Sequence, residues 1–316
     1  MMKNFIKAVA VLTVLLSSFA GIQLTASAQE ETIKIGILQY VEHEALDAAR
    51  EGFIERLEES EYGDRIEFDV QNASGNQTTL QSISEKIARD NDILYAIATP
   101  AAISLASLEQ EKPIFIAAVT DPVEAGLADS LEDPGRNVTG TSDMQPLEEQ
   151  VDLLVNNFPD AENIGLIYNS SEVNSQIQAD QAIELLEERG LETVEATVVS
   201  TNDIAQALNS IITEVDAMFM VTDNTIDSAI TLVGDIAKEN NVPTIGSSDA
   251  VVEQNGLATI SNSYTDYGTQ TADMVIRMLD EGLTPAEMPI ELGKDFEIVV
   301  NAEFAEAIGI DPESIK

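Results

Sequence analysis

Short runs of apolar residues alternate along the chain with amphipathic segments that have helical spacing. The first apolar run spans residues 33–38, and in the segment from Ala45 to Glu58 that follows it, apolar residues recur every three or four positions. Such a run predicts a buried strand, and such a segment predicts a helix with one apolar face. The alternation continues with strands predicted at 66–70, 94–98 and 114–119 and a helix at 80–90. Apolar strands that alternate with amphipathic helices indicate parallel βαβ units whose sheet is covered on both faces.

The same pattern begins again near residue 163. Gly165 stands 129 residues after Gly36, and Pro243 stands 130 residues after Pro113, in similar surroundings. A steady offset predicts two similar α/β lobes, although a chance echo between generic α/β segments is the alternative. The elements predicted in the second half are strands at 163–168, 194–199, 217–221 and 243–245 and a helix at 174–189.

The chain continues beyond the second lobe, with a helix predicted at 266–280, a strand at 296–300 and a short helix at 302–307. The simplest topology returns the first of these helices to the first lobe, so that the chain passes between the lobes near residues 140–143, 261–264 and 292. We therefore expect a first lobe made of residues 32–141 plus 263–291 and a second made of 142–262 plus 292–316. Several crossings between similar lobes form a hinge, and such a hinge predicts a cleft that closes.

The N-terminal stretch has the pattern of an export signal. Lys3 and Lys7 precede an apolar run at 8–19, and Ala26-Ser27-Ala28 fits a signal-peptidase cleavage site. We predict a signal peptide at residues 1–28, with an uncleaved anchor as the alternative, and in both cases an exported protein. A bacterial lipoprotein would need a cysteine at the cleavage site, and the chain has none.

Charge and composition narrow the class of protein. The chain of 316 residues has 57 Asp and Glu against 15 Lys and Arg, a net charge of −42, which argues against nucleic-acid partners. It has no cysteine, and His43 is its single histidine, so thiol chemistry and most metal and triad chemistry lack the necessary side chains. We predict a protein that is not an enzyme, with no catalytic residue, metal or cofactor, and interpret His43 as a polar residue that opens the first helix near the cleft.

Polar residues gather where the predicted strands end. Ligands of open parallel sheets bind beyond the carboxyl ends of the strands, so these positions are candidates for a binding site. They include Gln39 and Tyr40 after the first strand, Thr99 after the third, Thr120 and Asp121 after the fourth, and Asn169, Asp223, Asn224 and Asp249 in the second half.

Two of these strand ends resemble helix N-termini, Thr99-Pro100 and Asp121-Pro122. Thr and Asp are good N-cap residues, and proline is favoured at the first helical position. The free N–H groups of such helix ends would attract an anion, for example the carboxylate of an amino acid. The alternative is that the two side chains only cap their helices.

An amino acid also carries an ammonium group, which needs a charged partner when it is buried. Asp223 and Asp249 are the best placed carboxylates, because both follow strands of the second lobe. In so acidic a chain, either could instead be a solvated surface charge.

Several of these segments together resemble a known family, the exported substrate-binding proteins of ABC transporters, in the branch associated with tryptophan and other aromatic amino acids. The resemblance covers nearly the whole exported part and rests on blocks in order at 35–47, 98–101, 119–123, 137–143, 168–169, 222–224 and 247–249. It implies the type I periplasmic-binding-protein fold, which has two Rossmann-like lobes with parallel sheets joined by three crossovers. It implies that Thr99, Thr120, Asp121, Asn169, Asp223 and Asp249 line the pocket, with Ser142 and Tyr264 at the crossovers as additions.

We therefore expect this protein to be the solute-binding component of an ABC importer and to capture an amino acid. The resemblance implies an aromatic one, such as tryptophan or phenylalanine. Its partners would be the permease and ATPase subunits, and the protein would be a monomer in solution. Two alternatives belong to other classes: a sensor of the same fold that reports to a membrane receptor, and a secreted α/β enzyme. The sequence does not support the alternative of a secreted enzyme, because no Gly-x-Ser-x-Gly elbow occurs in the chain.

Overall fold

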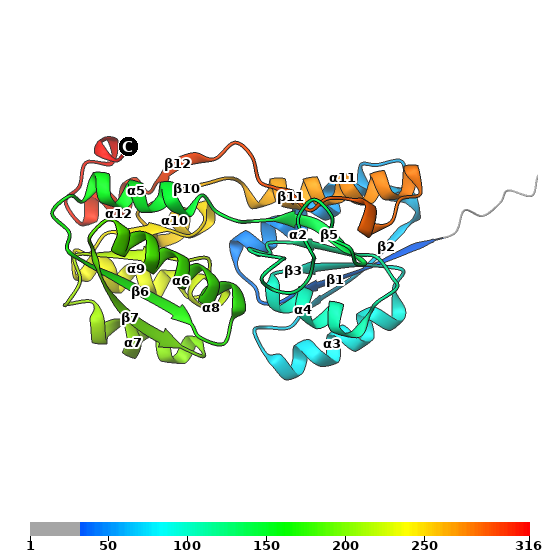
Figure 1. Cartoon of the computed structure of the whole chain (residues 1–316), viewed down its shortest axis with the longest axis horizontal. Helices are drawn as coiled ribbons and strands as arrows, with labels where there is room; N and C mark the ends of the chain where they lie inside the picture. The colour runs from blue at the N-terminus through cyan, green and yellow to red at the C-terminus, as the bar shows by residue number, and fades with distance from the viewer. Residues whose placement is uncertain (1–31) are drawn as a thin grey trace, which may run out of the picture. The chain divides into compact units, whose positions relative to one another are not determined.

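Two six-stranded sheets, each covered by helices, form the described part of the protein (Figure 1). This computed structural model describes residues 32–316, so the predicted signal peptide lies outside the described residues. The strand order is β11-β5-β4-β3-β1-β2 in one sheet and β12-β10-β9-β8-β6-β7 in the other. We call the first sheet and its helices the first lobe, and the second sheet and its helices the second lobe.

The first lobe carries most of the N-terminal half of the chain together with one long helix from the C-terminal part. It contains the strands β1 (Ile33–Gln39), β2 (Ile66–Asn72), β3 (Ile93–Ile97), β4 (Ile114–Ala117), β5 (Val138–Ser142) and β11 (Glu291–Leu292), the helices α2 (Glu44–Glu58), α3 (Gln77–Asp90), α4 (Thr99–Leu108) and α11 (Tyr264–Glu281), and the short 3₁₀ helices η1 (Gly63–Arg65) and η3 (Pro285–Glu287).

The second lobe repeats this organisation. It contains the strands β6 (Asn163–Asn169), β7 (Glu192–Val198), β8 (Ala217–Met220), β9 (Thr244–Gly246), β10 (Ala258–Ser261) and β12 (Glu297–Val300), the helices α5 (Leu147–Asn157), α6 (Val173–Glu188), α7 (Ile204–Ile211), α8 (Asn224–Asp227), α9 (Ile230–Glu239), α10 (Asp249–Asn255) and α12 (Ala302–Ala307), and the 3₁₀ helices η2 (Thr201–Asp203) and η4 (Pro312–Ser314).

The strand pairs are parallel with one exception. In the first sheet Ile37 lies opposite Val70 on one side and Tyr95 on the other, and all pairs of that sheet run parallel. In the second sheet, β12 pairs antiparallel with β10, with Ala258 opposite Val300. The expectation of parallel sheets is therefore confirmed except at this edge, where the returning C-terminal segment enters the sheet from the opposite direction.

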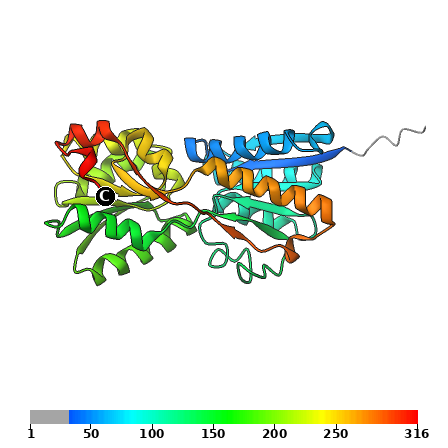
Figure 2. The ribbon, with the colours of Figure 1, turned by 90° about the horizontal axis from the view of Figure 1, so that it is seen from above.

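Helices α2 and α11 lie side by side over one face of the first sheet, and α2 is held there by the core of the lobe (Figure 2). Phe53 of α2 stacks on Tyr95 of β3 with ring centroids 3.8 Å apart, and the Tyr95 hydroxyl donates to the Ala49 carbonyl of α2 at 3.2 Å. Both rings are fully buried, so each contributes a large apolar surface to the core. Helices α3 and α4 pack together over the opposite face.

The chain passes between the two sheets three times (Figure 2). It leaves the first sheet after Ser142, returns after Ser261 through α11, and leaves again after Leu292 to form β12. These three segments are the structural basis for a hinge between the lobes.

Candidate functional site

The end of β1 carries two of the predicted site residues, and they have different roles. The Gln39 side chain is fully engaged within the first lobe: its Nε2 donates to Asp47 Oδ1 at 2.8 Å and to the Val41 carbonyl, and its Oε1 accepts from Arg50 Nη1 at 2.6 Å. Gln39 therefore fixes the loop between β1 and α2.

Tyr40, by contrast, brings the first lobe close to charges of the second. Burial, together with the negative charges of Glu172 and Asp223, raises the pKa of Tyr40 to about 12. Its hydroxyl donates to the Gly75 carbonyl at 3.4 Å, and only 4% of the residue is exposed. The strand ends of the two lobes thus form one electrostatic environment.

The start of α4 corrects the expectation that Thr99 is an N-cap. Helix α4 begins at Thr99, so the N-cap is Ala98, which has a φ of 81° and no side chain that could cap the helix. The predicted helix start beside Pro100 is confirmed, but the Thr99 side chain lies inside the first turn. Its Oγ1 is buried and has no hydrogen-bond partner among residues 32–316. Thr99 is therefore free to bind a ligand group.

Asp121-Pro122 does not start a helix, and this expectation was wrong. Residues 122–126 form turns, in which Asp121 Oδ1 accepts from the backbone N–H groups of Val123 at 3.1 Å and Glu124 at 3.0 Å. A short Asx-type turn satisfies these N–H groups locally, so no helix is needed after the proline. The carboxylate of Asp121 is half-exposed and serves this turn.

The ends of β4 and β5 meet at the first crossover. Ser142 Oγ donates to the Thr120 carbonyl at 2.8 Å and accepts from the Met144 N–H, so this serine ties the two strand ends together. Beside it, Asp143 Oδ2 accepts from the Tyr264 hydroxyl at 2.6 Å. Because Tyr264 begins α11, this bond links the first and second crossovers.

Asp143 is a buried carboxylate that the composition of the chain gave no reason to choose as a ligand-binding residue. It is 1% exposed, and its Oδ1 has no hydrogen-bond partner among the described residues. Burial raises the pKa of Asp143 to about 6, against the hydrogen bond from the Tyr264 hydroxyl, which lowers it. A buried carboxylate oxygen without a donor is suited to a ligand that brings one.

In the second lobe, Asp223 is buried and fully bonded to the backbone. Its Oδ2 accepts from the Asn169 N–H at 2.5 Å, and its Oδ1 accepts from the Ile226 N–H at 2.9 Å, so it caps α8 and joins the ends of β6 and β8. Burial raises the pKa of Asp223. In this arrangement Asp223 anchors the start of α8 to the end of β6.

Glu172 is a residue that sequence reasoning missed. Its Oε1 accepts from the Asn169 amide at 3.2 Å and from the Thr225 hydroxyl at 2.6 Å, and its Oε2 accepts from the Asn224 amide at 2.6 Å. Burial and the charge of Asp223 raise the pKa of Glu172. The only available signal was its position three residues after the end of β6, within an acidic chain.

His43 and Asn224 meet across the lobes. His43 is the N-cap of α2, which confirms that it opens the first helix, and its Nε2 is buried without a partner among residues 32–316. Burial lowers the pKa of His43 to about 4, while the Asn224 side chain raises it. The imidazole is therefore neutral at pH 7 and contacts the same asparagine that binds Glu172.

Asp249 belongs to a different group of charges. It lies at the start of α10, capped by Ser248, and lines a cavity of about 350 Å³ at the second crossover with Ser261 and Asn262. Burial raises the pKa of Asp249 to about 6, and the neighbouring charges that act on it are Glu253 and Asp266. The neighbouring charge that acts on Glu172 is instead that of Asp223.

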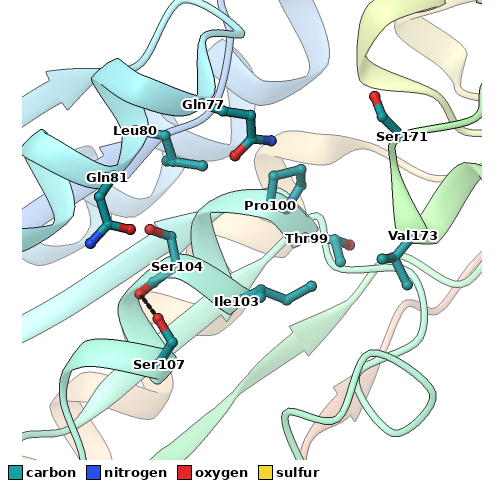
Figure 3. A pocket seen from close by; sticks show the side chains of 10 residues that line it. All are labelled: Gln77, Leu80, Gln81, Thr99, Pro100, Ile103, Ser104, Ser107, Ser171 and Val173. Carbon is teal, nitrogen blue, oxygen red and sulfur yellow. Dashed lines mark hydrogen bonds between the residues drawn. The ribbon is translucent and has the colours of Figure 1, made fainter. Parts of the chain in front are cut away.

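A cavity of about 320 Å³ opens beside Thr99 (Figure 3). The first lobe contributes Leu80 of α3 and Pro100 and Ile103 of α4, and the second lobe contributes Ser171 of the loop after β6 and Val173 at the start of α6. In Figure 3, Thr99 lies between Pro100 and Val173. The lining combines apolar carbon with a few hydroxyl and amide groups, which is typical of a small-molecule site.

The raised pKa values predict how stability depends on pH. Asp143 and Asp249 have folded-state pKa values of about 6 against an ordinary value of 3.8, so each favours folding most below pH 3.8 and loses that contribution as pH rises to about 6. The lowered pKa of His43 acts in the opposite direction and offsets much of this effect, whereas the pKa of Glu172, which burial and the charge of Asp223 raise to about 7, adds to it. We expect the free energy of unfolding to be larger at pH 5 than at pH 7.5, on the order of 1–3 kcal/mol.

Thermal unfolding of the wild type at the two pH values measures this difference. Asp143→Asn removes one of the titrating groups and is expected to flatten the dependence. Equal unfolding midpoints at pH 5 and pH 7.5 in the wild type would contradict the assignment.

The match to a known family covers nearly all of the described chain. The family described as ABC transporter substrate binding protein matches residues 34–315. The chain belongs to this family, whose members are binding proteins rather than enzymes and serve ABC transporters outside the cytoplasm. None of the helices between residues 32 and 316 combines the length and apolar character that a membrane span requires.

Individual relatives agree with the family. A tyrosine-binding protein of Clostridioides difficile is 39% identical over 277 residues, which cover 87% of this chain and 80% of that protein. The structure of an ABC domain from Streptococcus pneumonia in complex with L-Trp is 36% identical, with a TM-score of 0.85 over 90% of this chain and 97% of the other. A ligand-free, open substrate binding protein with adhesive properties from Clostridium difficile is 38% identical, with a TM-score of 0.68 over 89% and 96% of the two chains.

The two-lobed α/β architecture is that of type I periplasmic binding proteins, as expected. A solute binding protein from Bacillus halodurans with bound myo-inositol has a TM-score of 0.60 at 19% identity, over 87% of this chain and 97% of the other, and so shares the fold alone.

Proposed function

We propose that this protein captures an aromatic L-amino acid between its lobes and delivers it to the permease and ATPase of an importer. The relatives named as binding tyrosine and as holding L-Trp support the class of ligand. The observation that carries the proposal is the set of buried acceptors without donors where the strands end, in particular Asp143 Oδ1. These acceptors come from the crossover and from both lobes, so a ligand that satisfies them also bridges the lobes.

The ammonium group of the ligand binds Asp143 in this proposal. The Tyr264 hydroxyl already holds Asp143 Oδ2 at 2.6 Å, which leaves Oδ1 as the free carboxylate oxygen. A buried ammonium group needs such a charged partner, and the ion pair in turn offsets the cost of burying Asp143. Asp223, which the sequence also indicates as a partner for the ammonium group, supports the site through Asn169 and α8, and Asp249 is a secondary candidate near the second crossover.

The carboxylate of the ligand binds the N-terminus of α4. This helix has no side-chain cap, and the unpartnered Thr99 hydroxyl lies in its first turn. Uncapped N–H groups and the helix dipole both favour an anion at this position. Thr120, one strand along, supports the site through its carbonyl, which accepts a hydrogen bond from Ser142 Oγ at 2.8 Å. The aromatic ring extends into the cavity beside Thr99, against Leu80, Ile103 and Val173.

We also propose that residues 1–28 direct export, that the protein is a monomer, and that the two lobes have the boundaries given above. A thermal-shift screen of the protein against the common amino acids tests the ligand class, because a ligand at a hundred times its Kd stabilises by about 2.7 kcal/mol. We expect tyrosine, tryptophan or phenylalanine to give the largest shifts. Stabilisation by a sugar and by no amino acid would contradict the proposal.

Closure of the cleft is a separate expectation. A ligand that contacts both lobes stabilises the arrangement in which they are together, and the three crossovers carry the rotation while each lobe stays rigid. We expect a smaller radius of gyration by solution scattering with saturating ligand than without, and unchanged far-UV circular dichroism. Superimposable scattering curves at saturation would exclude closure.

A further inference from the structure

The cavity beside Thr99 has a polar end that the proposed function does not yet use (Figure 3). Part of its lining follows one face of α4, at Thr99, Pro100, Ile103 and Ser104. Residues three and four apart lie one above another on a helix. The cavity therefore runs lengthwise beside α4, from the start of the helix past the apolar Ile103 to the hydroxyl of Ser104.

The Ser104 hydroxyl is backed by a second, fully buried hydroxyl. Ser84 of α3 is 0% exposed, and its Oγ lies 2.7 Å from Ser104 Oγ, which is its side-chain hydrogen-bond partner among residues 32–316. Each hydroxyl carries one proton, so the bond between them uses one proton of two. If Ser104 donated, the Ser84 proton would be buried without an acceptor, which is costly. Ser84 therefore donates, and Ser104, which is partly exposed and lines the cavity, keeps its own proton for a group in the cavity.

The walls between the two ends of the cavity define what reaches Ser104. They include the apolar side chains of Leu80, Ile103 and Val173, so the middle of the ligand has to be apolar. Ser104 lies five residues beyond Thr99, or about 7.5 Å along the helix axis. A tyrosine spans about 7 Å from its carboxylate carbon to its phenol oxygen, as a sum of ordinary bond lengths. Phenylalanine has the same ring but carries no hydroxyl at its far end.

We propose that Ser104, oriented by Ser84, is the residue that selects L-tyrosine over L-phenylalanine. Its hydroxyl donates a hydrogen bond to the phenol oxygen of the bound ligand, whose carboxylate lies at the start of α4. A site that bonds a hydroxyl of its ligand discriminates against the analogue without it, because a polar group of the site then loses its partner. The proposal rests on the proposed function, since it concerns the far end of the same ligand.

Titration calorimetry of wild type and Ser104→Ala with L-tyrosine and with L-phenylalanine at pH 7.5 tests the proposal. We expect the wild type to bind tyrosine about tenfold more tightly than phenylalanine, the factor that one hydrogen bond provides. In Ser104→Ala the Kd for tyrosine is expected to rise by about five- to tenfold, and the Kd for phenylalanine to stay within about twofold. The ratio of the two Kd values therefore falls toward one. A merely structural role would not move this ratio, because a distorted α4 weakens both ligands.

Ser82→Ala is the matched control. Ser82 lies on the exposed face of α3, and its hydroxyl donates to the Thr78 carbonyl of the same helix at 3.1 Å. The ratio of Kd values in this variant is expected to equal that of the wild type. Ser104→Cys replaces Ser104→Ala if the alanine protein does not fold, since a thiol has nearly the same shape and is only a weak donor.

The outcomes separate this proposal from the proposed function. Equal affinity of the wild type for the two amino acids, or a Ser104→Ala protein that keeps the full preference for tyrosine, overturns the role of Ser104 and leaves the capture of aromatic amino acids standing. Failure of the wild type to bind tyrosine, phenylalanine or tryptophan rejects the proposed function, and the role of Ser104 with it.

Discussion

Asp143→Asn is expected to weaken the binding of L-tryptophan by about a hundredfold or more, on the order of 3 kcal/mol. The substitution keeps the shape of the side chain and an acceptor for the Tyr264 hydroxyl, which lies 2.6 Å from Asp143 Oδ2. It removes the negative charge, so the ammonium group of the bound ligand would be buried without a charged partner. Titration calorimetry at pH 7.5 measures the change in Kd.

Asp121→Asn is the matched control for this prediction. Asp121 follows the neighbouring strand and was also predicted to bind the ligand, but its carboxylate serves a turn and it is half-exposed. We expect the Kd of the Asp121→Asn protein for L-tryptophan to remain within about threefold of the wild-type value. If the folded Asp143→Asn protein bound L-tryptophan with the wild-type Kd, another group would have to bind the ammonium of the ligand.

Gly268→Ala is expected to cost about 3 kcal/mol or more of folding stability. Gly268 lies in α11 where this helix crosses α2, and a Cβ atom at this position would lie 2.0 Å from the Ala49 carbonyl oxygen and 2.8 Å from the Phe53 nitrogen. Both contacts are with backbone, which cannot rotate away, so the helices would have to separate. Because Tyr264 begins α11, separation would also displace the partner of Asp143.

Chemical denaturation of the variant measures this loss. Thr269→Ala, the next position of the same helix, changes a half-buried side chain outside the close contact and is expected to cost about 0.5 kcal/mol or less. A Gly268→Ala protein as stable as the Thr269→Ala protein would show that α2 and α11 can move apart at little cost.

The apolar strands and amphipathic helices could be predicted from the sequence because burial on both faces leaves a continuous apolar run. The run at 33–38 became β1, and the pattern at 45–58 became α2. β5 gave no such signal, since it is built from Val138 and small polar residues. Its buried hydroxyls bond to distant groups instead: Thr139 donates to the Met288 carbonyl and Thr141 to the Tyr267 carbonyl. Such partners lie more than a hundred residues away and leave no local pattern.

The location of the candidate site could be predicted from the sequence. The roles of its individual residues could be predicted less well. Polar strand ends indicate the binding edge of a parallel sheet whatever each side chain does. The role of a given acid depends on donors from elsewhere in the chain, as with Glu172, whose partners Asn224 and Thr225 follow it by about fifty residues. The N-cap of α4 was misassigned because tertiary packing holds Ala98 at a φ of 81°, which no local rule for alanine predicts.

Titration calorimetry of the protein with L-tyrosine, L-tryptophan and L-phenylalanine, with L-leucine and myo-inositol as comparisons, tests the central claim most directly. We expect one binding site per chain, micromolar or tighter affinity for at least one aromatic amino acid, and much weaker binding of the comparison ligands. Binding of leucine or inositol in preference to all three aromatic amino acids, or no heat with any of the five at millimolar concentration, would contradict it.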